Sequence, residues 1–364
     1  MPPRREPGAG ATGYLPFPGD TLRLTRTAVR TAGLWLLILA LVLLTTEWIA
    51  RRELARRLLL VPAVSTALRP LDLQVAGIAA MASARRRIDC ILVGSSVAWT
   101  SLDPREIDAG LRNRGAPPLG CYNFGLGSLT VEEAAALSRI LVGDYHPRVL
   151  VYAFTVRDFR SVTLQEDPTR ILGLPWVRYR EGDASFEGWL TAHSAAYRQM
   201  LPYRLLLRPN AWKAMRWHDG RRSIDGFMPS SVVAAEAALP VRVKSLFGRA
   251  ADQAMPATLG ALGDLLDLGA DGVQVMLLEV PVSRAALVAY APTMQEYRPF
   301  VRDLRRRART HHARFARRSG AFVPEGGWSD PIHMNEAGAR LWSRWVGERL
   351  ATLHEHTHPP AEGS

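Results

Sequence analysis

Five short apolar runs limit what this chain can fold into from residue 88 onward. Each run has the length of a strand and is bounded by Gly, Pro or polar residues, and helical stretches lie between the runs. Strands that alternate with helices are typical of an α/β domain with a parallel sheet. The predicted strands are Ile88–Val93, Leu119–Phe124, Val149–Phe154, Val273–Val280 and Ala321–Pro324. We therefore predict a three-layer α/β/α sandwich with a parallel five-stranded sheet in residues 88–354.

Two helices in this region carry clear start signals. Asp103 is placed as an N-cap, with Pro104 at the first helical position and Glu106 at the third, so a helix is predicted to about Arg112. Asn335 is the predicted N-cap of a last helix over residues 336–353.

Residues from about 159 to 268 show no strand pattern and are predicted to be an insertion between the third and fourth strands. The segment is too long for a simple crossover connection. It is either a cap over the carboxyl edge of the sheet or an ordinary helical subdomain with an aromatic core. Its aromatic residues include Trp176, Trp189, Tyr197, Tyr203, Trp212 and Trp217.

The segment Thr31–Thr46 contains no charged residue and is followed by Glu47 and Trp48. At about 1.5 Å per residue, residues 31–50 span a hydrocarbon core of about 30 Å. A cleaved signal peptide is the alternative, but no small-x-small cleavage site precedes Glu47, and Trp48 suits a membrane interface. We therefore predict an uncleaved, single-pass transmembrane anchor.

The flanks of this anchor do not decide its orientation. Arginines lie on both sides of it, and their distribution leans towards a cytoplasmic C-terminal part. Residues 1–30 are predicted to be a disordered basic tail, residues 51–87 a helical juxtamembrane stalk, and residues 355–364 a second disordered tail. The flanking arginines are Arg23, Arg26, Arg30, Arg51, Arg52, Arg56 and Arg57.

The net charge of +12, from 46 basic and 34 acidic residues, suggests a nucleic-acid partner. The anchor and the absence of a reader motif argue against one. The densest charge, Arg302–Arg318, is predicted to be a helix with a solvated basic side, and a patch for anionic polymers or lipid headgroups is the alternative. The predicted buried stripe of this helix is Val301, Leu304, Ala308 and Phe315.

Two short motifs carry the residue types of a serine triad. Gly94-Ser95-Ser96 delivers a hydroxyl to the carboxyl end of the first strand, where ligands bind in open α/β sheets. Asp330 and His333 precede the last helix, so the carboxylate can orient one ring nitrogen while the other acts as a base. Alone, each motif also fits an ordinary turn or cap.

Together, Gly94-Ser95-Ser96 and Asp330-Pro331-Ile332-His333 resemble the first and last sequence blocks of the SGNH or GDSL hydrolase superfamily. The resemblance implies an SGNH/flavodoxin-like sandwich in which Ser96 is the nucleophile, His333 the base and Asp330 the orienting acid. With its N-terminal anchor, the chain resembles the branch that contains the D-alanine transfer protein of lipoteichoic acid modification and the alginate O-acetyltransferases.

The two middle blocks of the superfamily are only partly kept. Residues 123–128 are similar to its Asn-x-Gly-x-x-Gly block, which implies an oxyanion hole made by the backbone of Ser96 with that of Gly127 or Ser128. In the third block Arg157 replaces an asparagine. Its guanidinium could donate to the oxyanion, bind an acidic substrate group or pair with Asp158.

This resemblance implies two-step acyl transfer from an ester or acyl donor to water or to a sugar hydroxyl, without a metal or cofactor. The expected substrate is a cell-envelope glycan or polymer, with the domain outside the cytoplasm and a membrane-bound acyltransferase as a candidate partner. The alternative is a non-catalytic, membrane-tethered protein of this fold that binds an anionic polymer or a partner.

Cys90 and Cys121 each precede a motif glycine by four residues, on strands expected to be neighbours. We expect buried free thiols, because the geometry between neighbouring parallel strands seldom suits a bridge.

Overall fold

The computed structural model describes residues 26–52, 59–65, 68–85, 87–159, 170–206, 223–233, 256–284, 286 and 294–357. The chain divides into two compact units, Met1–Ile49 and Ala50–Ser364. Most of the predicted N-terminal tail, the end of the predicted C-terminal tail, Trp212 and Trp217 lie outside the described residues.

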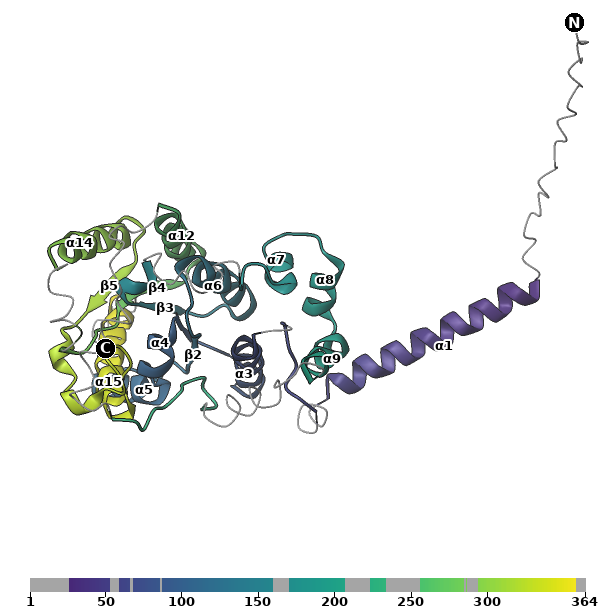
Figure 1. Ribbon diagram of the computed structural model, residues 1–364, viewed down its shortest axis with the longest axis horizontal. Coiled ribbons are helices and arrows are strands. Elements are labelled where there is room, and N and C mark those ends of the chain that lie inside the picture. The colour runs from purple at the N-terminus through teal and green to yellow at the C-terminus, as the bar shows by residue number, and fades with distance from the viewer. Residues whose placement is uncertain are drawn as a thin grey trace, which may run out of the picture. The chain divides into compact units, whose positions relative to one another are not determined.

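The first unit contains one long helix, α1, Arg26–Ala50 (Figure 1). Residues 28–50 of this helix are long and apolar enough to cross a membrane, and the predicted span 31–50 lies within them. Large apolar side chains such as Leu36 and Leu44 are exposed along it. Such a surface suits a hydrocarbon environment better than water.

The second unit is built on a parallel sheet with the strand order β2-β1-β3-β4-β5, which is the flavodoxin-like order. This sheet confirms the predicted α/β fold class. The strands are β1 Cys90–Gly94, β2 Cys121–Gly125, β3 Val149–Phe154, β4 Gln274–Glu279 and β5 Arg314–Arg317.

Helices cover both faces of this sheet and form two separate apolar cores, which completes the predicted three-layer sandwich. The first layer contains α3 Arg69–Arg85, α6 Val131–Tyr145, α12 Pro256–Asp267 and α14 Met294–Thr310. The second contains α4 Ser96–Ser101, α5 Pro104–Asn113 and α15 Glu336–Thr357.

The predicted caps of α5 and α15 are present. Asp103 accepts a hydrogen bond from the backbone N–H of Arg105 at 2.9 Å. Asn335 Oδ1 accepts from the N–H groups of Ala337 and Gly338, each at 3.1 Å. Both caps satisfy backbone donors that a helix start otherwise leaves without partners.

Part of the segment predicted as a stalk belongs to the packed core. Leu71 and Ile78 of α3 are almost completely buried in the first core. Gln74, on the same helix, donates to the carbonyl of Gly125 at the end of β2, at 2.8 Å. The helix α3 is therefore tied to the carboxyl edge of the sheet, while the domain boundaries themselves stay predictions.

The insertion lies between β3 and β4, and its described regular elements are helices, whereas residues 223–233 are turns and loop. Trp176 is buried in the first core, whereas Trp189 is 46% exposed. The described elements between the two strands are η1 Val156–Phe159, α7 Pro175–Arg180, α8 Phe186–His193, α9 Ala195–Leu206, α12 and η4 Leu268–Asp271.

The predicted fifth strand is wrong in position. Residues 320–322 form a 3-10 turn, and the strand at that edge is Arg314–Arg317. The predicted helix over 302–318 accordingly ends at Thr310, and Phe315 lies on β5. The arginines of this strand are exposed at the sheet edge, where charge protects a free edge from pairing with other chains.

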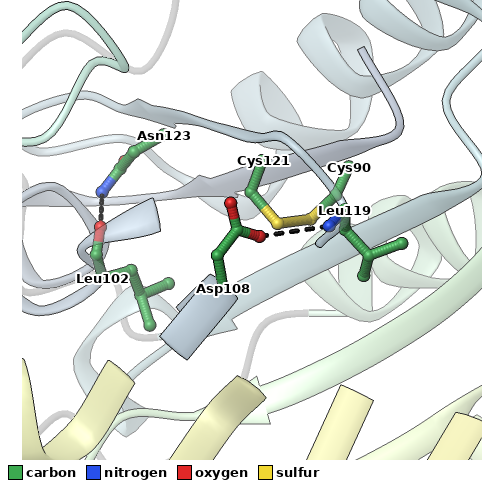
Figure 2. Close-up of a disulfide and its surroundings, with 6 residues drawn as sticks. All are labelled: Cys90, Leu102, Asp108, Leu119, Cys121 and Asn123. Atoms are coloured by element: carbon green, nitrogen blue, oxygen red, sulfur yellow. Dashed lines mark hydrogen bonds between the residues drawn. A yellow bond between two sulfur atoms is a disulfide. The ribbon is translucent and has the colours of Figure 1, made fainter. Parts of the chain in front are cut away.

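The prediction of free thiols is also wrong, because Cys90 and Cys121 form a disulfide (Figure 2). The two cysteines are directly opposite each other in the β1–β2 register, with Cα atoms 4.3 Å apart. This register brings the two sulfur atoms together. Beside the bridge, Asp108 accepts a hydrogen bond from the N–H of Leu119 at 3.1 Å, which fixes the entry to β2 (Figure 2).

Candidate active site

Close packing around the end of β1 presents Ser96 at the carboxyl edge of the sheet. Ser96 is the first residue of α4, and Ser95 is its N-cap. A Cβ atom on Gly94 would lie 2.2 Å from the carbonyl oxygen of Ala153, and one on Gly125 would lie 2.5 Å from the backbone nitrogen of Trp99. Glycine is therefore required at both places for α4 to lie so close to the strands.

Ser96, His333 and Asp330 form a continuous hydrogen-bonded series. Ser96 Oγ lies 2.8 Å from His333 Nε2, and His333 Nδ1 lies 2.6 Å from Asp330 Oδ2. All three side chains are only partly buried. The structure thus brings together the residues that the sequence predicts, in the order nucleophile, base and orienting acid.

The carboxylate of Asp330 is held by the backbone of its own loop. Its Oδ1 atom accepts from the N–H groups of Ile332 and His333, at 2.9 and 2.8 Å. Burial of Asp330 by itself raises the pKa of its carboxyl group. The hydrogen bond and the charge interaction with His333, together with the two backbone N–H groups, have a larger opposite effect and lower the pKa below its usual value. Asp330 is therefore a carboxylate at neutral pH.

Contacts at both ends of the loop that carries His333 hold it in place. Trp328 and Met334 pair as an isolated antiparallel bridge and are almost completely buried. Between them, Ser329 donates to the carbonyl of His333 from its backbone N–H, at 2.9 Å, and from its hydroxyl, at 3.1 Å. These contacts fix the position of His333 before any substrate binds.

Asn123 on β2 links α4 to this strand through hydrogen bonds. Its amide nitrogen donates to the carbonyl of Leu102 at 2.6 Å (Figure 2). The same nitrogen donates to the carbonyl of Ala98, and Asn123 Oδ1 accepts from the N–H of Gly125, each at 2.9 Å. The residue is completely buried. The sequence places Asn123 in a motif, but its task of positioning α4 became visible only in the structure.

The two backbone candidates for the oxyanion hole differ in their surroundings. Ser128 lines the pocket beside Ser96, whereas Gly127 does not line it and accepts a hydrogen bond on its carbonyl from Arg170 at 3.0 Å. Ser128 also has a φ of 58°, a conformation that favours glycine. The side chain of Arg157, the third candidate, lies outside the described residues, although its backbone belongs to η1.

The pocket beside Ser96 is small, with a volume of about 20 Å³, and both polar and apolar residues line it. Such a volume holds roughly one water-sized group. Thr155 and Asp158 at the rim are also linked, since Asp158 accepts from the N–H of Thr155 at 2.8 Å. The pocket is lined by Ser95, Ser96, Val97, Ser128, Leu129, Thr130, Thr155, Asp158 and Ile332.

Residues 223–233 of the insertion contact β2, α4 and the start of α15. The carbonyl of Asp225 accepts from the N–H of Asn123 at 2.8 Å, on the free edge of β2. Met228 donates to the carbonyl of Trp99 on α4 at 3.1 Å, and Ser230 accepts from the N–H of Glu336 at the start of α15 at 2.8 Å. No feature of the sequence pattern predicts this connection.

Within the described residues, no group of three or more His, Cys, Asp and Glu side chains is arranged to hold a metal ion.

No family model matches the chain, and no curated protein matches it. It is similar to a solved structure from Bacteroides fragilis that is assigned as an acylhydrolase, with 11% identity, a TM-score of 0.36, and coverage of 73% of this chain and 86% of that one. It is also similar to a GDSL-like lipase from Bacteroides thetaiotaomicron, with 9% identity, a TM-score of 0.33, and coverage of 77% of this chain and 98% of that one. A third similar structure, from Parabacteroides merdae, is assigned as a GDSL-like lipase, with 13% identity, a TM-score of 0.34, and coverage of 72% of this chain and 97% of that one. At TM-scores this low, these likenesses assign no activity to the chain.

Proposed function

We propose that this chain is a membrane-anchored serine esterase or O-acyltransferase of the SGNH type. The observation that carries the proposal is the series of contacts from Asp330 through His333 to Ser96, with distances of 2.6 and 2.8 Å. The residues come from two ends of the domain, and the sequence motifs resemble the superfamily blocks. A serine is activated as a nucleophile when a base lies within hydrogen-bond distance of it and a third group orients that base.

In the proposed mechanism, Ser96 Oγ attacks the carbonyl carbon of an ester while His333 Nε2 accepts the hydroxyl proton. The negatively charged Asp330 stabilises the imidazolium that forms. The backbone N–H groups of Ser96 and Ser128 are the proposed donors to the oxyanion, with Gly127 as the alternative to Ser128. His333 then protonates the leaving alcohol, and the acyl group remains on Ser96.

In the second step, His333 removes a proton from water or from an acceptor hydroxyl, which attacks the acyl-serine. Water gives an esterase, and a sugar hydroxyl gives an O-acyltransferase. The volume of about 20 Å³ beside Ser96 supports a small acyl group. The resemblance supports a cell-envelope glycan or polymer as the substrate, and a membrane-bound acyltransferase as a supplier of the acyl group.

The disulfide supports a location of the domain outside the cytoplasm. Disulfides persist in oxidising compartments and are rare where thiols are kept reduced. The Cys90–Cys121 bridge therefore supports the orientation that the flanking arginines leave undecided. A reporter enzyme fused after Ala50 tests this orientation, since activity only in a cytoplasmic reporter would contradict it.

Turnover of 4-nitrophenyl acetate by the detergent-solubilised full chain tests the activity. Ser96→Ala should lower kcat by at least about a thousandfold, because the nucleophile is lost. Ser95→Ala, the matched control, should keep the activity within a few fold. Equal activity of the Ser96→Ala variant and the wild type would contradict the proposal, and no turnover in any variant would favour the non-catalytic binding protein.

A further inference from the structure

A groove at the free edge of β5 lies apart from the pocket beside Ser96 and shares no residue with it. Its volume is about 480 Å³. Its walls come from both helical layers, because Arg305 belongs to α14 and Trp345 to α15. We call it the arginine groove, and its main lining residues are Arg305, Phe315, Arg317, Arg318, Trp345 and Arg349.

The positive charge of the arginine groove exceeds the negative charge around it. Arg317 pairs with Glu279, with Nε 3.1 Å from Oε2. In the part of the chain that the structure describes, Arg305, Arg318 and Arg349 make no ion pair. Three positive groups around one cavity repel one another, and a bound anion would relieve that repulsion.

Aromatic rings hold these guanidinium groups in place. The guanidinium of Arg318 lies 3.6 Å from the ring centroid of Phe322, and that of Arg349 lies 5.5 Å from the Trp345 ring. Arg305 lies over Phe315 at 5.4 Å. A guanidinium stacked on a ring keeps its N–H edges available for an oxyanion, and less entropy is lost when the anion binds.

We propose that the arginine groove binds a soluble polyanion through phosphate or carboxylate groups along its chain. Guanidinium forks match both oxyanions in a bidentate manner. The volume of about 480 Å³ exceeds what one small anion fills, and the groove crosses the sheet edge from one layer to the other. A polymer that presents several charges in a row can contact Arg305, Arg318 and Arg349 at once.

The lining of the groove favours a polymer over a lipid surface. Surfaces that lie on membranes combine basic residues with protruding apolar side chains. Trp345 is only 5% exposed, and none of the exposed large apolar residues among the described ones lines the groove.

Binding of fluorescently labelled polyphosphate to the full chain in neutral phosphatidylcholine nanodiscs tests the proposal. The triple variant Arg305→Gln, Arg318→Gln and Arg349→Gln should weaken binding by at least about tenfold, because direct oxyanion contacts are lost. The control variant Arg302→Gln, Arg309→Gln and Arg314→Gln removes the same charge from exposed positions outside the groove and should weaken binding by less than about threefold. Equal weakening by the two variants would overturn the proposal.

Further arms separate the kinds of anion and guard against misfolding. If inorganic phosphate binds as tightly as polyphosphate, the polymer assignment is wrong. Loss of polyphosphate binding in nanodiscs that contain phosphatidylglycerol would also overturn it, because lipid headgroups would then fill the groove. Arg318→Lys with Arg349→Lys keeps the charge and should still weaken binding about threefold or more, since the fork is lost. Ser96→Ala should bind polyphosphate like the wild type, so this proposal and the proposed function fail separately.

Discussion

Cys90 and Cys121 are joined across β1 and β2, and Gly94 and Gly125 lie opposite each other four residues further along the same two strands. The covalent link therefore joins the strand that leads to Ser96 to the strand that leads into the proposed oxyanion loop. It limits how far the two loops can separate when the carboxyl edge of the sheet fluctuates.

Reduction of this disulfide should destabilise the domain. The cysteines are 31 residues apart in the chain, and closing a loop of this length contributes roughly 3 to 4 kcal/mol by restricting the unfolded chain. Thermal unfolding with and without a phosphine reductant measures the effect. The double variant Cys90→Ala and Cys121→Ala is the control, and its unfolding temperature should not respond to the reductant. An equal response in both proteins would contradict the prediction.

Asn123→Ala should impair both stability and catalysis. The variant leaves buried backbone groups of α4 and Gly125 without their partner, at a cost of roughly 2 to 3 kcal/mol. Because Asn123 positions α4, kcat for 4-nitrophenyl acetate should fall at least about tenfold with KM changed less. Asn113→Ala, on the exposed end of α5, is the control and should be neutral. A stability loss with unchanged kcat would reduce Asn123 to a structural role.

Asp72 should make the stability of the domain fall as the pH rises. Burial raises the pKa of this completely buried carboxyl from 3.8 to about 7, although N–H groups of Val64 and Ser65 oppose the shift. Between these two values the folded form holds a proton that the unfolded form has lost. The contribution of Asp72 to stability is therefore greatest below pH 3.8 and declines up to about pH 7.

The variant Asp72→Asn does not titrate and isolates this effect. Its free energy of unfolding, relative to the wild type, should rise by roughly 2 to 3 kcal/mol between pH 5 and pH 8. Urea unfolding of both proteins at the two pH values measures the change. Parallel pH dependence in the two proteins would show that Asp72 is not protonated in the fold.

The small pocket should limit the length of the acyl group. We expect kcat/KM to fall at least about tenfold from 4-nitrophenyl acetate to the butyrate, because the pocket beside Ser96 has little room for a longer chain. Leu129→Ala enlarges the pocket and should reduce this preference. Leu137→Ala removes a buried leucine of α6 that does not line the pocket, and should destabilise similarly without changing the preference. The same shift in both variants would contradict the pocket assignment.

The sequence predicts most of the fold because its signals are local. Four of the predicted strands overlap β1 to β4, since apolar runs bounded by turn residues mark buried parallel strands. β5 is missed because Arg314 and Arg317 lie at an exposed edge and continue the arginine pattern of α14. Charge suited to a solvated helix face is equally suited to a protected sheet edge.

The contacts that sequence reasoning misses are those that depend on register and on distant segments. The Cys90–Cys121 bridge follows from the alignment of β1 with β2, which two isolated strands do not reveal. The contact of Asp225 with Asn123 joins the insertion to β2 without any motif. By contrast, the short motifs around Ser96 and His333 are recognisable because the chemistry fixes their residue types.

The most direct test of the central claim is the mass of the full chain after reaction with a fluorophosphonate, followed by peptide mapping. An activated serine reacts with this reagent, whereas an ordinary serine does not. We expect one adduct, on Ser96, that forms in the Ser95→Ala variant and is absent from the Ser96→Ala and His333→Ala variants. An adduct that persists in Ser96→Ala, or one that maps to another residue in the wild type, would contradict Ser96 as the nucleophile.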